Sequence, residues 1–175
     1  MVNAANTGGV TGFGLDEMVN RAAGDFEIKR ARRAFGGIAT GDAKFTRSYN
    51  HSKVKFIIHA VGPVYRANAT GRGCSTEDKD RLLASAYRSA LARAGELGAA
   101  TVGFCLLSAG VFRGDRPLTD LALVALRALA AAARTPVAEV SVFAYTEDEA
   151  SALSAALALL GGGGGGAAGS GQATA

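Results

Sequence analysis

The sequence predicts a single α/β domain, a three-layer α/β/α sandwich built on a mostly parallel mixed sheet. Three observations predict this fold class. The 175 residues are enough for one domain with a sizeable core. Hydrophobic residues make up 49% of the chain and charged residues 19%, which is typical of a compact globular protein. Short apolar runs alternate with segments of helical periodicity, the pattern of strand–helix units around a parallel sheet.

The first half of the chain is expected to contain three strands and two helices. Strands are predicted over Val2–Ala5, Ala43–Arg47 and Val54–Val61, and helices over Leu15–Ala23 and near Phe26–Phe35. The run VKFIIHAV is nearly all apolar, which indicates a strand covered on both faces of the sheet. The first helix is expected to stop at Gly24, because glycine readily adopts the backbone conformation that ends helices.

The second half continues the alternation of helices and strands. Helices are predicted over Glu77–Glu96, Leu118–Ala133 and Glu147–Leu160, and strands over Thr101–Leu107 and Val137–Tyr145. The long helix over 77–96 carries apolar residues at helical spacing and is closed by Gly98. The domain is therefore expected to span residues 1–160. Residues 161–175 contain only small and uncharged residues apart from one glutamine, so we expect a flexible Gly/Ala/Ser-rich tail.

Bulk properties exclude several classes of function. The net charge of +4 suits an anionic ligand, but the chain has no arginine-rich stripe with interleaved aromatics, so nucleic acid is not expected as a partner. The basic cluster Lys29–Arg33 is interpreted as a solvated helix face. Cys74 and Cys105 match no metal spacing, and no metal or cofactor is expected. The apolar segment 118–133 is too short to span a bilayer. The two widely spaced cysteines indicate a reducing, intracellular compartment, and the protein is predicted to be a monomer.

Two loops rich in small residues are placed to bind phosphates. The first runs from Asn6 to Gly14 and leads into a helix; the second, Ser108–Gly114, follows the strand over 101–107. Parallel sheets bind ligands at the carboxyl ends of their strands, and small residues let phosphates approach backbone N–H groups. Two such loops facing each other would hold a diphosphate. A dinucleotide fingerprint fails because Glu17 stands where its third glycine belongs, and no Walker lysine follows either loop.

Four sequence blocks, in order, give the chain a specific resemblance. They are VNAAN with GFGLDEMVNRAAG (2–6 and 12–24), GDAKFTRSYN (41–50), IIHAVGPVY (57–65) and LLSAGVF (106–112). Together they resemble the macrodomain family, which binds ADP-ribose. The interval between Asn6 and Asp16 is similar to that of the MacroD-type hydrolase branch, whereas LLSAGVF and Asn20 resemble coronavirus macrodomains.

The resemblance implies a set of site residues. Asn6 and Asp16 would be catalytic, flanking the scissile carbon of the ribose. The first loop would bind the distal ribose and diphosphate through Ala4, Asn6, Gly12, Gly14, Leu15 and Asp16. The second loop would bind the phosphates through Ser108, Ala109, Gly110, Val111 and Phe112. Phe143 matches an aromatic residue that stacks on adenine in viral members. A carboxylate and an amide suit this chemistry, because they can orient water and a ribose hydroxyl.

The chain departs from the family pattern at several places. Phe13 interrupts the usual consecutive glycines, and Arg113 replaces a glycine, so that it either contacts a phosphate or points to solvent. The family's strands before VNAAN, with a Gly-Asp turn that recognises adenine, are absent from this sequence, and we expect an N-terminal truncation. His59 lies within an apolar strand and is interpreted as a core histidine rather than a base.

Three functions stay open from the sequence. The leading interpretation is an ADP-ribose-binding domain that hydrolyses ADP-ribose esters on acidic side chains of proteins, or O-acetyl-ADP-ribose. The first alternative is a non-catalytic reader of mono- or poly-ADP-ribose. The second is an inactive fragment. Asp16 has a structural interpretation as well, because an acidic residue in the first turn stabilises a helix whatever the function.

Overall fold

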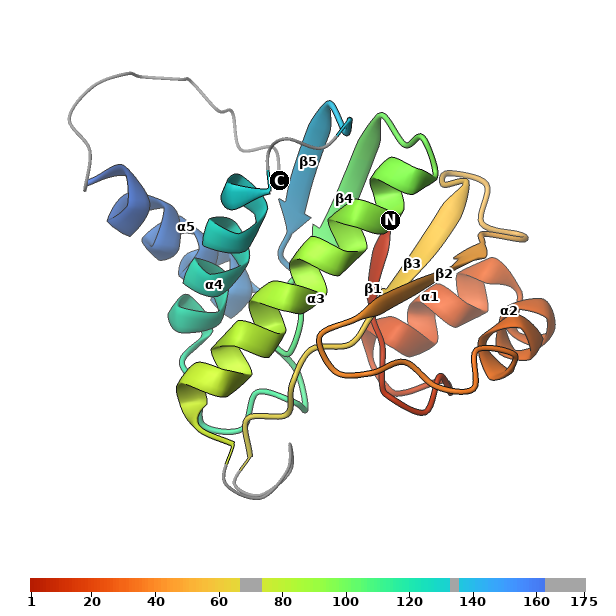
Figure 1. Ribbon diagram of the computed structural model, residues 1–175, viewed down its shortest axis with the longest axis horizontal. Coiled ribbons are helices and arrows are strands. Elements are labelled where there is room, and N and C mark those ends of the chain that lie inside the picture. The colour runs from red at the N-terminus through yellow and green to blue at the C-terminus, as the bar shows by residue number, and fades with distance from the viewer. Residues whose placement is uncertain (67–73, 133–135, 163–175) are drawn as a thin grey trace.

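The computed structural model of the chain shows helices on both sides of a central set of strands (Figure 1). It describes residues 1–66, 74–132 and 136–162. The strands are β1 (Val2–Ala4), β2 (Ala43–Arg47), β3 (Phe56–Ala60), β4 (Thr101–Cys105) and β5 (Glu139–Phe143). The helices are α1 (Leu15–Ala23), α2 (Asp25–Arg33), α3 (Thr76–Glu96), α4 (Leu118–Ala131) and α5 (Glu147–Gly161). The predicted three-layer sandwich with a mixed sheet is confirmed.

The strands form two hydrogen-bonded ladders that lie side by side. In the first, β3 is central, with β1 parallel on one side and β2 antiparallel on the other. In the second, β4 and β5 pair in parallel. The ladders meet where β1 lies next to β4 (Figure 1), and the Cys105 thiol there donates to the Val2 carbonyl over 3.7 Å. All four parallel strands therefore have their carboxyl ends at one edge, where parallel sheets bind ligands.

Successive residues of β3 show why this strand is apolar throughout. Ile58 packs into the large core beneath α3 and α4, whereas Ile57 packs against Val19 of α1 and Ile28 of α2. Side chains alternate between the two faces of a strand, so a strand covered by helices on both sides buries all of them. The apolar run VKFIIHAV is therefore explained, as predicted, by burial on both faces of the sheet.

The observed helix ends lie close to the predicted ones, because residues near each end determine where a helix begins or stops. Ser75 caps α3 in a reciprocal capping box with Asp78, and Thr146 caps α5 by accepting a hydrogen bond from the Glu149 backbone N–H. Gly24 ends α1 with a φ of 87°. Strand ends agree less well. Leu106 and Leu107 were expected in a strand but lie in the turn that begins the second loop.

Two expectations require correction. Gly161 belongs to α5, so the tail does not begin there; residues 163–175, where flexibility was predicted, lie outside the described part of the chain. The basic cluster of α2 is not wholly solvated, because Arg32 is completely buried. Its guanidinium meets a buried carboxylate, which offsets the cost of removing a charge from water. Among the described residues, no helix is long and apolar enough to cross a membrane.

Candidate functional site: a pocket between two loops

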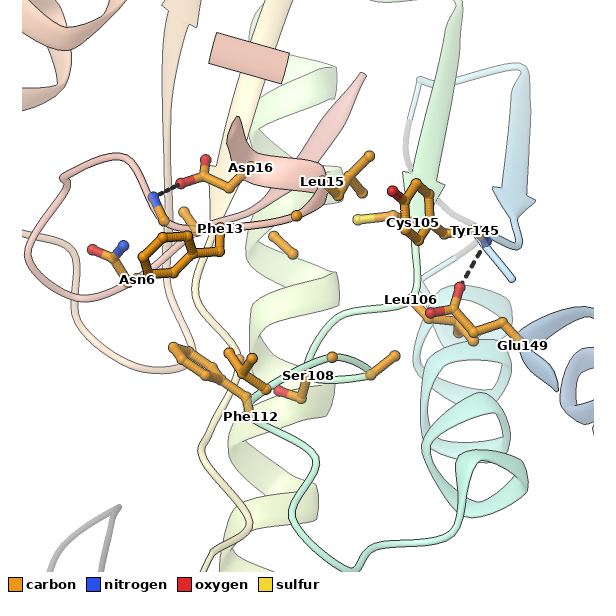
Figure 2. A pocket seen from close by; sticks show the side chains of 18 residues that line it. Asn6, Phe13, Leu15, Asp16, Cys105, Leu106, Ser108, Phe112, Tyr145 and Glu149 are labelled. Carbon is orange, nitrogen blue, oxygen red and sulfur yellow. Dashed lines mark hydrogen bonds between the residues drawn. The ribbon is translucent and has the colours of Figure 1, made fainter. Parts of the chain in front are cut away.

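A pocket of about 230 Å³ opens at the carboxyl ends of β1 and β4 (Figure 2). The first and second loops form its walls, and the start of α5 closes one end. It contains all the residues predicted to bind ADP-ribose except Phe143. Its lining residues are Ala4, Ala5, Asn6, Gly12, Phe13, Gly14, Leu15, Asp16, Gly62, Cys105, Leu106, Ser108, Ala109, Gly110, Val111, Phe112, Tyr145 and Glu149.

The first loop brings the start of α1 to the pocket. Gly14 precedes the helix with a φ of 68°, a conformation that favours glycine. The helix then begins at Leu15, which lines the pocket. The first N–H groups of a helix have no partner within it and carry partial positive charge. This wall of the pocket is therefore suited to an anion such as a diphosphate.

Asn6 holds the first loop from its beginning. Its side-chain nitrogen donates to the Val10 carbonyl over 2.8 Å, and its side-chain oxygen accepts from the Val10 N–H over 3.3 Å. The amide is half-buried and lines the pocket at the end nearest Phe13 (Figure 2). Asn6 therefore both shapes the loop and presents a polar group to a ligand.

Asp16 holds the same loop from its end. One carboxylate oxygen, Oδ2, accepts from the Gly12 N–H over 2.6 Å and from Arg32 over 3.3 Å. The other, Oδ1, accepts from Arg32 over 2.7 Å, from Asn20 over 3.0 Å, and from Asn3. The residue is only 4% exposed. Both oxygens are thus engaged by donors of the chain, and the carboxylate fixes the backbone that lines the pocket.

Arg32 makes this arrangement possible, and sequence reasoning missed it. Besides its bidentate contact with Asp16, it donates to the Asn20 side chain over 3.0 Å and to the Val10 carbonyl over 3.0 Å. The Val10 carbonyl therefore receives hydrogen bonds from both Asn6 and Arg32. A planar guanidinium suits such convergent contacts, because its donors are fixed in a fork. The one local signal is its spacing: Arg32 lies four residues after the buried Ile28 and so on the same face of α2.

His59 supports this network from β3. Its ring lies 3.2 Å from the Asn3 amide nitrogen through Nδ1 and 3.1 Å from the Thr46 hydroxyl through Nε2. Burial, reinforced by the positive charge of Arg32, lowers the pKa of His59 from 6.5 to about 3. The interpretation of His59 as a core histidine agrees with this placement. It lies beneath the first loop and does not line the pocket.

The second loop is held from beneath by α3. The Leu107 N–H donates to the Tyr87 hydroxyl over 2.8 Å, and the Ser108 hydroxyl donates to the Pro63 carbonyl over 2.8 Å. Ser108 adopts a φ of 61°, which is unusual for a residue other than glycine. A side chain at Gly62 would overlap the Ser108 hydroxyl, so glycine is needed there. These contacts fix the backbone at the start of the second loop.

Phe13 and Phe112 stand on opposite walls at the Asn6 end of the pocket (Figure 2). Phe13 is 90% exposed, so its ring flanks the opening without filling it. Phe112 is half-buried, and its carbonyl accepts from the Tyr65 N–H over 2.7 Å. Arg113 does not line the pocket; it donates to the Arg116 carbonyl over 3.4 Å.

The opposite end of the pocket contains residues that the sequence did not indicate. Tyr145 and Glu149 line it, together with Cys105 (Figure 2). Burial raises the pKa of the Cys105 thiol to about 12. Phe143 lies outside the pocket: it is 63% exposed, and its ring carbons come within 2.9 Å of where a side chain at Gly103 would begin. Tyr145, two residues later, brings an aromatic ring to the pocket.

Within the described ranges, no group of three or more His, Cys, Asp or Glu side chains is placed to hold a metal ion. The pocket wall is instead dominated by glycine, alanine and apolar side chains, with polar groups at its two ends. Such a surface suits a ligand that is bound through backbone N–H groups and a few directed hydrogen bonds.

Comparisons with known proteins agree with this geometry. The pattern of the macro domain family matches residues 2–119. A macro domain-containing protein of Streptomyces nogalater is 40% identical over 131 residues, which cover 72% of this chain and 66% of that protein.

Two solved structures are similar throughout most of the fold. A variant of the Oceanobacillus iheyensis macrodomain with ADPR has a TM-score of 0.78 at 27% identity, covering 91% of this chain and 84% of its own. The Trypanosoma brucei macrodomain in complex with ADP-ribose has a TM-score of 0.72 at 28% identity, covering 89% and 62%. The two loops, the pocket between them and these matches lead to one conclusion: the chain belongs to the macro domain family.

Proposed function

We propose that the chain binds ADP-ribose in the pocket between the two loops and hydrolyses it from acidic side chains of modified proteins or from O-acetyl-ADP-ribose. The observation that carries this proposal is the placement of the α1 N-terminus opposite the Ser108–Phe112 loop, with Asn6 and Asp16 at one end. The structures of macrodomains with ADPR and ADP-ribose support it.

The diphosphate would lie in the middle of the pocket. The start of α1 offers backbone N–H groups and a positive dipole end from one side. The loop around Gly110 offers small residues and close backbone approach from the other. The distal ribose would then extend toward Asn6, whose amide can hold a ribose hydroxyl.

In hydrolysis, water replaces the protein carboxylate on the anomeric carbon, and the products are ADP-ribose and the free acidic side chain. Asp16 would act by fixing the Gly12 backbone and by placing negative charge near the carbon that becomes positive. Asn6 would orient the ribose hydroxyl beside it. These roles fit the MacroD-type branch that the interval between the two residues resembles.

The reader function has its own supporting observation. Both oxygens of Asp16 already accept hydrogen bonds from the chain, so the carboxylate offers no free position for activating a water molecule. A domain whose acidic residue is used to shape the loop can bind ADP-ribose without turning it over. The two functions therefore differ in turnover and not in binding.

The test combines calorimetry with ADP-ribose and a turnover assay on a mono-ADP-ribosylated protein. Asn6→Ala is the main variant: it removes the amide proposed to hold the ribose together with its two hydrogen bonds to Val10, while the contacts of Asp16 with Gly12 and Arg32 do not involve Asn6. Thr7→Ala is the matched control, since the Thr7 side chain is exposed. We expect wild-type turnover, and Asn6→Ala should lower it about 100-fold or more, in the range of a lost positioning group.

The alternatives give different results in the same assays. Binding of ADP-ribose without turnover by the wild-type protein would establish the reader. Cooperative melting with no shift in Tm on adding ADP-ribose, and no heat of binding, would overturn the ADP-ribose proposal and favour an inactive protein.

A further inference from the structure

One end of the pocket has a polar group that the proposed function does not yet use. Asn6 and Asp16 lie at one end of the pocket, and Tyr145 and Glu149 lie at the other (Figure 2). The walls proposed to hold the phosphates, with Leu15 on one and Ser108 on the other, lie between these ends (Figure 2). In a ligand with a ribose on each side of a diphosphate, the part that does not extend toward Asn6 must extend toward Tyr145 and Glu149.

Glu149 is held in place by the start of its own helix. Its backbone N–H donates to the Thr146 hydroxyl over 3.2 Å, and its carboxylate oxygen Oε2 accepts from the Tyr145 N–H over 2.8 Å. Thr146 is the N-cap of α5, and the Glu149 carboxylate reaches back to the residue before it. The residue is 8% exposed, yet it lines the pocket. Helix capping therefore fixes one oxygen of the carboxylate at the pocket wall.

The second oxygen of Glu149 is unused. Among residues 1–66, 74–132 and 136–162, no hydrogen bond to Oε1 is formed, and no basic side chain forms an ion pair with this carboxylate. Oε1 is not fully enclosed by the protein, and the residue lines the pocket. A ligand that brings an N–H donor to this end of the pocket can therefore reach this oxygen.

The aromatic ring beside Glu149 indicates which kind of ligand group would bind there. Tyr145 lines the same end of the pocket and is 55% exposed, so its ring is accessible to a flat partner. Aromatic side chains stack on nucleobases, with little preference among the bases. An acceptor at the base edge then decides which base is bound, because adenine carries an amine where hypoxanthine carries a carbonyl.

We propose that Glu149 accepts a hydrogen bond from the exocyclic amine of adenine and thereby selects ADP-ribose over the corresponding hypoxanthine nucleotide. This inference rests on the proposed ADP-ribose site. It assigns base selection to the start of α5, in a part of the chain where the sequence blocks indicated only an aromatic residue.

The test measures the affinities for ADP-ribose and inosine diphosphate ribose by calorimetry. The wild-type protein should prefer ADP-ribose by tenfold or more. In Glu149→Gln, the side-chain carbonyl still accepts from the Tyr145 N–H, while the amide N–H now favours a carbonyl on the base. The preference should fall toward one or reverse, with weaker ADP-ribose binding and stronger binding of the inosine nucleotide. Glu147→Gln, an exposed residue of the same turn, is the matched control and should leave both affinities unchanged.

A purely structural role for Glu149 gives a different pattern. Equal weakening of both ligands by Glu149→Gln, or an unchanged ratio, would overturn the proposal while leaving the ADP-ribose site intact. Thr146→Ala weakens the helix cap without changing the carboxylate, and it should lower Tm but keep the wild-type ratio. If Glu149→Gln does not fold, Glu149→Asp, which withdraws the carboxylate, should reduce the preference for ADP-ribose. Failure of the wild-type protein to bind either nucleotide would instead overturn the site itself.

Discussion

The two ends of the pocket are built in opposite ways. At the Asn6 end, buried side chains form a continuous network in which Arg32 and Asp16 hold the first loop through Val10 and Gly12. At the Tyr145 end, one capping carboxylate has an unused oxygen, and the aromatic ring is largely exposed. The polar groups of the first end are bonded to one another, whereas one carboxylate oxygen of the second accepts no hydrogen bond from the described part of the chain. Substitutions should therefore affect stability at the first end and selectivity at the second.

The largest effect is expected at Arg32. Arg32→Met removes the cation that faces the buried Asp16 carboxylate, and breaking a buried ion pair in this way costs about 3–5 kcal/mol. Urea unfolding should show that loss of free energy, and the affinity for ADP-ribose should fall with it. Arg33→Met, at the exposed neighbour, is the control and should change stability by less than about 0.5 kcal/mol. Similar losses in both variants would contradict the buried network.

A smaller loss is expected where the second loop is held. Gly62→Ala would force a methyl group against the Ser108 hydroxyl and disturb its hydrogen bond to Pro63. Overpacking of this kind costs about 1–3 kcal/mol. Differential scanning calorimetry should show a lower Tm, and ADP-ribose should bind more weakly. Gly110→Ala tests the specificity of this effect, because open space surrounds a side chain there and Tm should not change.

His59 should make the stability of the Asn6 end depend on pH. Its folded-state pKa of about 3 lies below the unfolded value of 6.5, so between these values the unfolded chain binds a proton that the folded chain does not. Stability should fall as pH decreases through this window, by up to about 1.4 kcal/mol per pH unit. Urea unfolding between about pH 6.5 and 5, above the usual carboxylate range, measures this slope. His59→Gln should flatten the slope, and an unchanged slope would contradict the prediction.

The smallest effect is expected at the Tyr145 hydroxyl. Its only hydrogen bond in the described part of the chain is to the Met18 sulfur over 3.4 Å, at an exposed position. Tyr145→Phe keeps the ring and should change both stability and ADP-ribose affinity by less than about 0.5 kcal/mol. Tyr145→Ala should weaken binding by about 1–3 kcal/mol through lost stacking while leaving stability nearly unchanged. Equal effects of the two variants on calorimetric affinity would contradict a role for the ring.

The same comparison of the two ends explains which residues of the site could be predicted from the sequence. The first loop lies within one short stretch, so Asn6, Gly12, Gly14 and Asp16 could be grouped from the glycine-rich loop, the helix start and the resemblance to the family. Their assigned roles in binding and catalysis stay predictions. The starts of α3 and α5 are set by the capping residues Ser75 and Thr146, whose side chains act on backbone groups three or four positions away.

Residues that act over long sequence separations could not be found in this way. Arg32 sits among exposed basic residues, and only the packing of α2 against α1 turns it toward Asp16. Glu149 looks like an ordinary capping residue until the topology brings α5 to the end of a pocket between the Asn6–Gly14 and Ser108–Gly114 loops. In both cases the local pattern is satisfied by a structural role, and the position near the pocket comes from tertiary contacts.

The buried thiol in the pocket wall has a consequence for the chemical sensitivity of the domain. With its pKa raised to about 12, Cys105 stays protonated at neutral pH, and the thiolate is the form that reacts with peroxides, alkylating reagents and disulfides. The sulfur instead donates to the Val2 carbonyl at the junction of the two ladders. The burial that makes this wall of the pocket apolar thus also keeps Cys105 in the less reactive thiol form.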